Sequence, residues 1–135
     1  TFHRPYREKA KALLVANSRR LVRAPWAYAQ TLIALDYYLD RSKEIAVIGP
    51  AENDHTRRLV AWLWGSFLPN KTLGLGLPQE NDPLPLLARK PMIGNKTTVY
   101  VCENNVCKLP TGDLEQVKQL VSDIKTYSLT PPSKN

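Results

Sequence analysis

The sequence has very few cysteines and no long hydrophobic run, and both shortages narrow its class. Cysteine accounts for 2 of the 135 residues, too few for the disulfide framework of a small secreted domain. No histidines accompany the cysteines at the spacing of a zinc site. The apolar runs are far shorter than the roughly 18 to 20 residues that span a bilayer. We therefore expect a protein without membrane segments, and a reducing cytoplasm as its default location.

Phosphate-binding motifs are also missing. Gly74 and Gly76 lie on a predicted strand, without the third glycine and the following helix that seat a pyrophosphate. The loop of residues 49–53 precedes a predicted helix and is the better anion candidate. Pro50 removes an amide donor from this loop, however, and Glu52 and Asp54 repel anions. We expect no cofactor.

No group of side chains has the pattern of a catalytic or metal site. His3 and His55 are single imidazoles in polar sequence, which is more typical of surface residues than of acid–base catalysts. Glu80 and Asp82 lie in an irregular stretch where nothing would tune a pKa. We therefore expect no metal and no independent enzymatic reaction in this chain.

What is present is the composition of an ordinary globular domain, with 43% hydrophobic and 23% charged residues. The net charge of +7 is concentrated near the N-terminus, which lacks a start methionine and a signal sequence. We expect the chain to be cut from a longer one. Between residues 1 and 25 a single acid, Glu8, accompanies seven basic residues: Arg4, Arg7, Lys9, Lys11, Arg19, Arg20 and Arg23.

Residues 5–23 are predicted to form an amphipathic helix, because apolar side chains such as Leu13, Leu14 and Leu21 recur at helical spacing. Most basic residues project away from this stripe. We favour a solvated face; the alternative is an anionic-ligand or nucleic-acid surface. That alternative needs interleaved aromatic or amide side chains, which this face lacks. Its residues would be Arg4, Arg7, Lys11, Arg19, Arg20 and Arg23.

A second helix is predicted over residues 26–39, with Pro25 in its first turn. This helix is apolar on almost all sides, and only Gln30, Thr31 and Asp36 are clearly polar. A helix that is apolar all round must be buried all round. We therefore expect its packing partners to lie in sequence outside this chain.

Residues 43–127 are predicted to form a small α/β unit. A β-branched strand over residues 44–50, a helix from the N-cap Asp54 to Phe67, and a strand over residues 72–77 make a right-handed βαβ unit. Residues 78–96 read as an irregular excursion with at most one helical turn. Strand 97–102 then turns at Asn104 and Asn105 into residues 106–109, a β-hairpin.

A last helix completes the predicted fold. Asp113 caps it, and its apolar stripe comprises Leu114, Val117, Leu120, Val121 and Ile124. The fold class is therefore α/β: an N-terminal helical hairpin (residues 1–42) is followed by a mixed sheet, a βαβ unit plus a β-hairpin, flanked by helices (residues 43–127). Residues 128–135 are expected to form a disordered tail.

The hairpin places Cys102 directly opposite Cys107 in a non-hydrogen-bonded pair, where cross-strand side chains approach closest. A disulfide is geometrically allowed there, but we favour two half-buried thiols. The four-residue spacing is not that of a thiol oxidoreductase motif at a helix N-terminus. A thiol-redox role of Cys102 and Cys107 stays open as the enzymatic alternative.

The segment 98–110 reads TVYVCENNVCKLP. It resembles the C-terminal signature of the YyaL-like, spermatogenesis-associated thioredoxin-domain family, approximately T-A-Y-V-C-x-N-x-x-C-x-x-P. Residues 68–70, strand 44–49 and residues 23–28 also resemble their counterparts in that family. The likeness extends from Arg7 to Val121.

This resemblance implies a thioredoxin-like domain, then an α-helical toroid similar to six-hairpin glycosidases, both upstream of a C-terminal region like this chain. The first two helices would close the toroid, and Tyr28 and Gln30 would be the residues nearest its pocket. The implied function is non-catalytic: the chain completes and stabilises the toroid, with the upstream domains as its partners. The activity of the whole family is unsettled and is expected to be carbohydrate-linked or redox.

Overall fold

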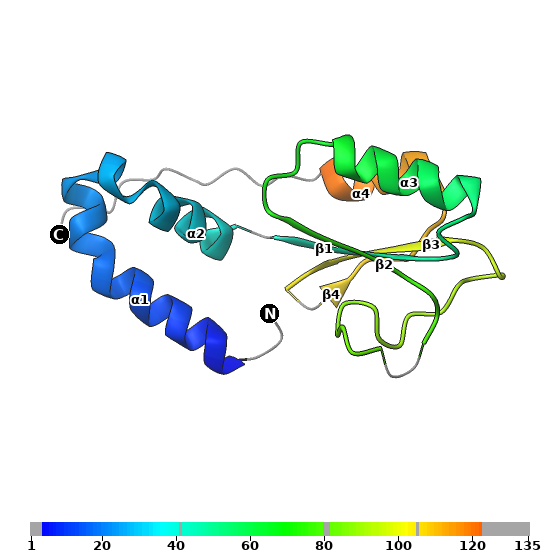
Figure 1. The fold of residues 1–135 in the computed structure, drawn as a ribbon, viewed down its shortest axis with the longest axis horizontal. Coiled ribbons are helices and arrows are strands. Elements are labelled where there is room, and N and C mark those ends of the chain that lie inside the picture. Colours follow the sequence, from blue (N-terminus) through cyan, green and yellow to red (C-terminus); the bar gives the residue numbers. More distant parts are fainter. Residues whose placement is uncertain (1–3, 41, 80–81, 105, 123–135) are drawn as a thin grey trace.

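An N-terminal helical pair and an α/β unit make up the fold (Figure 1). The computed structural model describes residues 4–40, 42–79, 82–104 and 106–122. The predicted tail, 128–135, lies outside these residues, and the boundary between residues 42 and 43 stays a prediction. In chain order the elements are α1 (Arg4–Arg23), the 3₁₀ helix η1 (Pro25–Tyr28), α2 (Ala29–Leu39), β1 (Lys43–Ile48), α3 (Asp54–Gly65), β2 (Lys71–Gly76), β3 (Thr98–Glu103), β4 (Val106–Cys107) and α4 (Leu114–Ser122).

The central strand of the sheet is β1, in the order β2-β1-β3-β4. It pairs in parallel with β2 and antiparallel with β3, which pairs antiparallel with β4. Residues 45–48 of β1 have no exposed surface, as expected for a continuous β-branched strand between two others. The predicted fold class, including the β-α-β segment and the β-hairpin, is confirmed.

One face of the sheet is covered by α3 and α4, which lie side by side in Figure 1. The side chains of Ile45 and Val47 on β1 and of Val99 and Val101 on β3 point to this face. They are fully or almost fully buried together with Leu59, Leu63, Val117 and Val121 from the two helices. This cluster is the main hydrophobic core, and its members come from the predicted apolar stripes.

The opposite face is covered by the irregular segment between β2 and β3. Leu87 of this segment packs with Ala46, Ile48 and Tyr100 of the sheet. A Cβ atom on Gly76 would lie 2.8 Å from Leu87 Cδ1, closer than side-chain atoms can approach. The two glycines of β2 thus serve the packing of this leucine.

Two helix boundaries differ from their predictions. Asn53 caps α3, and its Oδ1 accepts hydrogen bonds from the N–H groups of His55 and Thr56 at 2.8 and 3.2 Å. The predicted N-cap, Asp54, was wrong by one residue, because it is already helical. The helix ends at Gly65 instead of Phe67 because Ser66 is extended.

The last helix begins as predicted. Asp113 Oδ1 accepts a hydrogen bond from the N–H of Gln116 at 2.9 Å, which satisfies one of the free amides of the first turn. Ile124, the last residue of the predicted stripe, lies outside the described residues.

The predicted helix over residues 26–39 is divided. Its first turn is the 3₁₀ helix η1, and α2 begins at Ala29. Tyr28, with φ −125° and ψ 35°, lies outside the α region and interrupts the helical backbone. Ala24, with φ −146° and ψ 66°, lies outside the helical region, which the following proline disfavours.

Tyr100 provides a test of the packing on the sheet face that Leu87 covers. Its part-buried hydroxyl donates a hydrogen bond to the Pro91 carbonyl at 2.7 Å. We expect Tyr100→Phe to lower the free energy of unfolding at neutral pH by about 1 kcal/mol.

Burial raises the pKa of Tyr100 above its ordinary value of 10.0. The folded state therefore keeps a proton that the unfolded state loses, and native stability should fall as pH rises beyond 10.0. Urea unfolding at neutral and alkaline pH would measure both effects. An equal alkaline loss in Tyr100→Phe would contradict this assignment.

Candidate functional site

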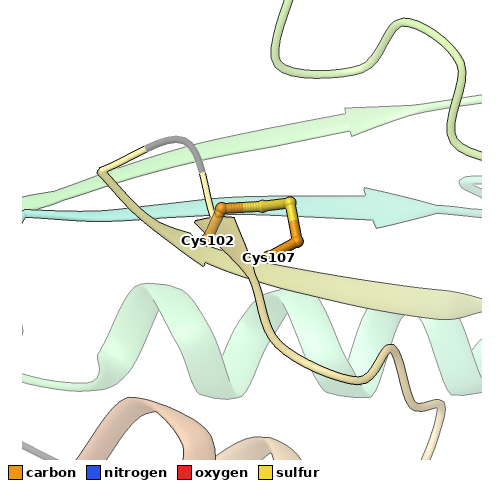
Figure 2. Close-up of a disulfide and its surroundings, with 2 residues drawn as sticks. All are labelled: Cys102 and Cys107. Atoms are coloured by element: carbon orange, nitrogen blue, oxygen red, sulfur yellow. A yellow bond between two sulfur atoms is a disulfide. The ribbon is translucent and has the colours of Figure 1, made fainter.

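The β3–β4 hairpin carries the two cysteines of the chain, and the structure joins them (Figure 2). Cys102 and Cys107 are register partners, as predicted. The expectation of two free thiols was wrong, because the sulfur atoms form a disulfide of 1.99 Å with Cα atoms 3.8 Å apart. Cys102 is 3% exposed, whereas Cys107 is exposed to solvent on the short strand β4. One sulfur thus belongs to a buried residue and the other to an accessible one.

The hairpin turn has the predicted geometry where it is described. Asn104 adopts a positive φ of 50°, a conformation that asparagine tolerates better than most residues. Asn105, the second residue of the predicted turn, lies outside the described part of the chain. The positive φ brings β4 back along β3 and so sets the two cysteines opposite each other.

Beside the disulfide, a carboxylate lies on the same sheet face. Glu44 of β1 is the register partner of Cys102, and its Oε2 atom is buried and has no hydrogen-bond partner among the residues that the structure describes. Lys90 lies close enough to Glu44 to interact with its charge. Burial lowers the pKa of Lys90, and the negative charge of Glu44 partly opposes this shift. The sequence alone does not point to Glu44, because its relation to Cys102 depends on strand register.

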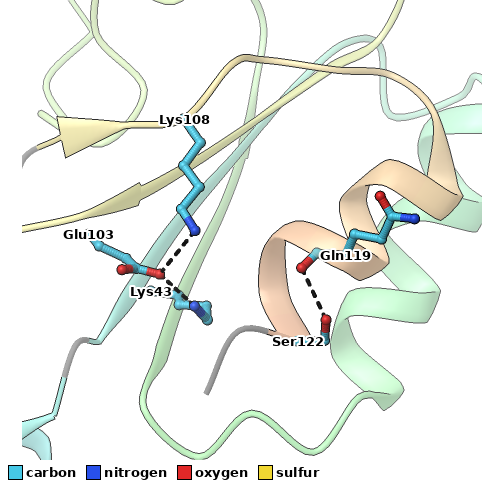
Figure 3. A network of polar contacts seen from close by, with 5 residues as sticks. All are labelled: Lys43, Glu103, Lys108, Gln119 and Ser122. Carbon is cyan, nitrogen blue, oxygen red and sulfur yellow. Dashed lines mark hydrogen bonds and ion pairs between the residues drawn. The ribbon is translucent and has the colours of Figure 1, made fainter. Parts of the chain in front are cut away.

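On the opposite sheet face, an ion pair anchors the hairpin (Figure 3). Lys43 Nζ lies 2.6 Å from Glu103 Oε1, and the two side chains are only 7% and 13% exposed. Lys108 Nζ is 3.9 Å from the same oxygen. Lys43 and Glu103 are register partners in β1 and β3. Removing one partner would leave a buried charge uncompensated, so this pair fixes the register of the sheet.

A groove of about 930 Å³ lies between the helical pair and the edge of the sheet. Its wall includes the exposed apolar side chains of Leu13 and Ile33, which are 66% and 61% exposed. Gln30 lines the groove, whereas Tyr28 does not. The proposed relation of these two residues to a toroid pocket stays a prediction.

Polar contacts connect α2 to the sheet at one end of this groove. Asn70 Nδ2 donates hydrogen bonds to Asp36 at 2.7 Å and to Asp40 at 2.9 Å. The hydroxyls of Tyr37 and Thr72 are 3.3 Å apart. These contacts place α2 against the start of β2, and they leave most of its apolar side chains outside any core.

The predicted basic face lies on α1. Arg7, Lys11, Arg19, Arg20 and Arg23 are all exposed, and Arg4 is the first residue of the helix. Arg7 lines the groove next to Tyr6. This exposure fits a solvated face, and binding of nucleic acid or an anionic ligand stays an untested alternative.

A second cleft, of about 690 Å³, lies where the N-termini of α3 and α4 meet the sheet. His55 Nε2 donates a hydrogen bond to the Gly112 carbonyl at 2.7 Å and so ties the two helix starts together. Asn53 and Asp113 already cap these helices. The amides that would attract an anion are therefore partly occupied, which weakens the anion site considered for residues 49–53.

Neither a metal centre nor a membrane helix is found where the structure is described. Within residues 4–40, 42–79, 82–104 and 106–122, no three His, Cys, Asp or Glu side chains cluster closely enough to hold a metal ion. In the same ranges, no helix combines the length and apolar character needed to cross a membrane.

Gly49 provides a test of the packing beneath the second cleft. Thr56 Oγ1 and Thr97 Oγ1 are buried and hydrogen-bonded at 2.7 Å, and a Cβ on Gly49 would lie 2.7 Å from Thr97 Oγ1. We expect Gly49→Ala to destabilise the fold by about 1–3 kcal/mol. Gly65→Ala is the matched control, because its Cβ would meet nothing within 4 Å. Equal unfolding midpoints for the two variants in urea would contradict the expected clash.

Comparison with known proteins finds similarity along almost the whole chain. Spermatogenesis-associated protein 20 of Homo sapiens is 30% identical over 128 residues, and its namesakes in Rattus norvegicus and Mus musculus are 29% and 28% identical. The alignments cover 90% of this chain but 16% of each relative. No protein-family model and no solved structure matches the chain. The chain is thus similar to a short part of a longer protein, whose name agrees with the resemblance seen in the sequence.

Proposed function

We propose that this chain is a non-catalytic region of a larger polypeptide, in which α1, η1 and α2 pack against helices that precede the chain. The carrying observation is the exposure of large apolar side chains on these three helices. Trp26 is 80% exposed, Val22 86%, Ile33 61% and Leu39 58%. Burying each of them would contribute roughly 1.5–3 kcal/mol.

The packing of the α/β unit supports the proposal that only the helical pair docks onto preceding helices. Its sheet is covered on both faces by segments of this chain, whereas α2 has no buried residue. A helix that is apolar on several sides is stable only when other elements cover it. The α/β unit therefore serves as the self-contained base from which the helical pair extends.

The upstream partner that fits best is a helical toroid closed by α1 and α2. Two findings support it: the chain corresponds to 16% of the length of its curated relatives, and its sequence resembles the C-terminal region of a toroid-containing family. In this proposal the chain completes and stabilises the toroid, and any carbohydrate-linked or redox activity belongs to the preceding domains.

Substitution of Trp26 tests the docking in the complete polypeptide that carries this chain. We expect Trp26→Ser to lower its free energy of unfolding by about 3 kcal/mol, because the substitution creates a cavity in the docked interface. In the isolated chain the same change should stay within about 0.5 kcal/mol, since the side chain is exposed there.

Phe67→Ser is the matched control, because Phe67 is 89% exposed and lies beyond α3 in the α/β unit. We expect it to be close to neutral in both proteins. Thermal and urea unfolding would measure the stability of both variants, each in the isolated chain and in the complete polypeptide. Near-neutral Trp26→Ser in the complete polypeptide, or an equal loss in both variants there, would overturn docking through the helical pair.

A second function, thiol–disulfide exchange at the hairpin, is favoured by one observation: the cysteines form a disulfide, and Cys107 is exposed. In a reducing cytoplasm, the location expected from the sequence, disulfides are usually transient and serve catalysis or redox sensing. Attack by a thiolate requires access to a sulfur atom, and the exposed position of Cys107 offers that access.

This second function predicts that the disulfide opens while the chain stays folded. Protein purified without reductant should show no free thiol, and dithiothreitol should release both thiols without changing the far-ultraviolet circular dichroism. Brief alkylation should then label the exposed Cys107 before Cys102. Release of thiols only after unfolding would exclude a redox function for the hairpin.

A further inference from the structure

The two cysteines of the hairpin differ in their exposure to solvent. Thiol–disulfide exchange proceeds by in-line attack on one sulfur, so the attacked sulfur must be reachable. Cys107 is exposed on β4, whereas Cys102 is 3% exposed on β3. A partner would therefore form its mixed disulfide with Cys107, and Cys102 would be the thiol that closes or opens the internal bond.

Cys102 then needs a proton acceptor. A thiolate in a buried position is poorly solvated, and burial raises the pKa of a thiol. Before Cys102 can attack the mixed disulfide, its proton must move to a neighbouring group. Solvent is a poor acceptor for a residue that is 3% exposed.

The strand register places Glu44 beside Cys102. The backbone groups of Val99 and Val101 bond to Thr111 and Lys108, on the side of β3 away from β1. Cys102 therefore directs its own backbone groups toward β1, where Glu44 is its partner. Residues in such a hydrogen-bonded pair have Cα atoms about 5.5 Å apart and side chains on the same face.

The side chain of Glu44 has an unused acceptor. Its Oε2 is buried and makes no hydrogen bond within the described residues, which is costly for a carboxylate unless the oxygen has a function. Lys90 interacts with the charge of Glu44 from the segment that covers this face. Glu44 also borders the groove, whose other titratable residues include Arg7, Tyr38 and Asp40.

We propose that Glu44 accepts the thiol proton of Cys102 when the hairpin disulfide forms and returns it when the disulfide opens. This inference rests on the second function proposed above, thiol–disulfide exchange at the hairpin.

The reaction balances with a small-molecule or protein disulfide as oxidant. The Cys107 thiolate attacks this disulfide, forms a mixed disulfide and releases the first thiolate. Cys102 transfers its proton to the Glu44 carboxylate, and the resulting thiolate attacks Cys107 Sγ. The second thiolate of the partner leaves as the internal bond forms. Two electrons pass from the hairpin to the partner, and a dithiol reverses the sequence.

The test measures closure, which is the conversion of the mixed disulfide at Cys107 into the internal disulfide. The reduced chain is mixed with oxidised glutathione, and acid-quenched samples are analysed by mass spectrometry for the mixed and internal disulfides. We expect Glu44→Gln to slow closure about 10- to 100-fold near neutral pH. The closure rate of Glu44→Gln should also rise about tenfold per pH unit, because the Cys102 thiolate must then form without the Glu44 carboxylate as base.

Glu52→Gln is the control, since Glu52 is an exposed carboxylate in the loop that follows the opposite end of β1 from Glu44. Its closure rate should match that of the unchanged chain. Circular dichroism establishes that all four proteins, the unchanged chain and its three variants, are folded. Glu44→Asp should restore part of the rate, because it keeps a carboxylate.

The outcomes separate the two proposals. Closure rates and pH profiles that are the same in Glu44→Gln and the unchanged chain would overturn the role of Glu44 and leave the redox function standing. Failure of the folded chain to exchange with dithiothreitol or glutathione would overturn the redox function itself, and with it the role of Glu44.

Discussion

The burial of β1 on both faces is the constraint on which the rest of the structure depends. A strand with no exposed residue from Ile45 to Ile48 must be hydrogen-bonded along both edges and covered above and below. The pairing with β2 and β3 satisfies the edges. The α3–α4 layer covers one face, and the long connection carrying Leu87 covers the other. The candidate site residues of the α/β unit take their positions from these strand pairings.

The central strand and its partners could be predicted because their pattern is local. A β-branched run identifies β1, and helical spacing identifies the stripes of α3 and α4. The 3₁₀ turn at Pro25–Tyr28 could not be predicted from the sequence. Trp26 and Tyr28 fit the apolar pattern of a helix whatever their exact backbone conformation. Asn53 and Asp54 are both good caps, and only the backbone decides between them.

The site could be predicted only in part. The two-residue turn gave the pairing of Cys102 with Cys107, since hairpin length determines register. The oxidation state of the cysteines is not encoded in that spacing. The position of Glu44 next to Cys102 depends on how β1, distant in sequence, aligns with β3, and no local pattern contains that information.

The disulfide closes a very short loop, and this limits what it contributes to the stability of the fold. Its cysteines are separated by 5 positions. Crosslinking so small a loop removes little entropy from the unfolded chain, roughly 2 kcal/mol against about 4.7 kcal/mol for a 100-residue loop. The hairpin is also held by the buried contact between Lys43 and Glu103. The disulfide thus stabilises the fold less than a crosslink over a long loop would, and loss of this bond would leave the Lys43–Glu103 contact to hold the hairpin.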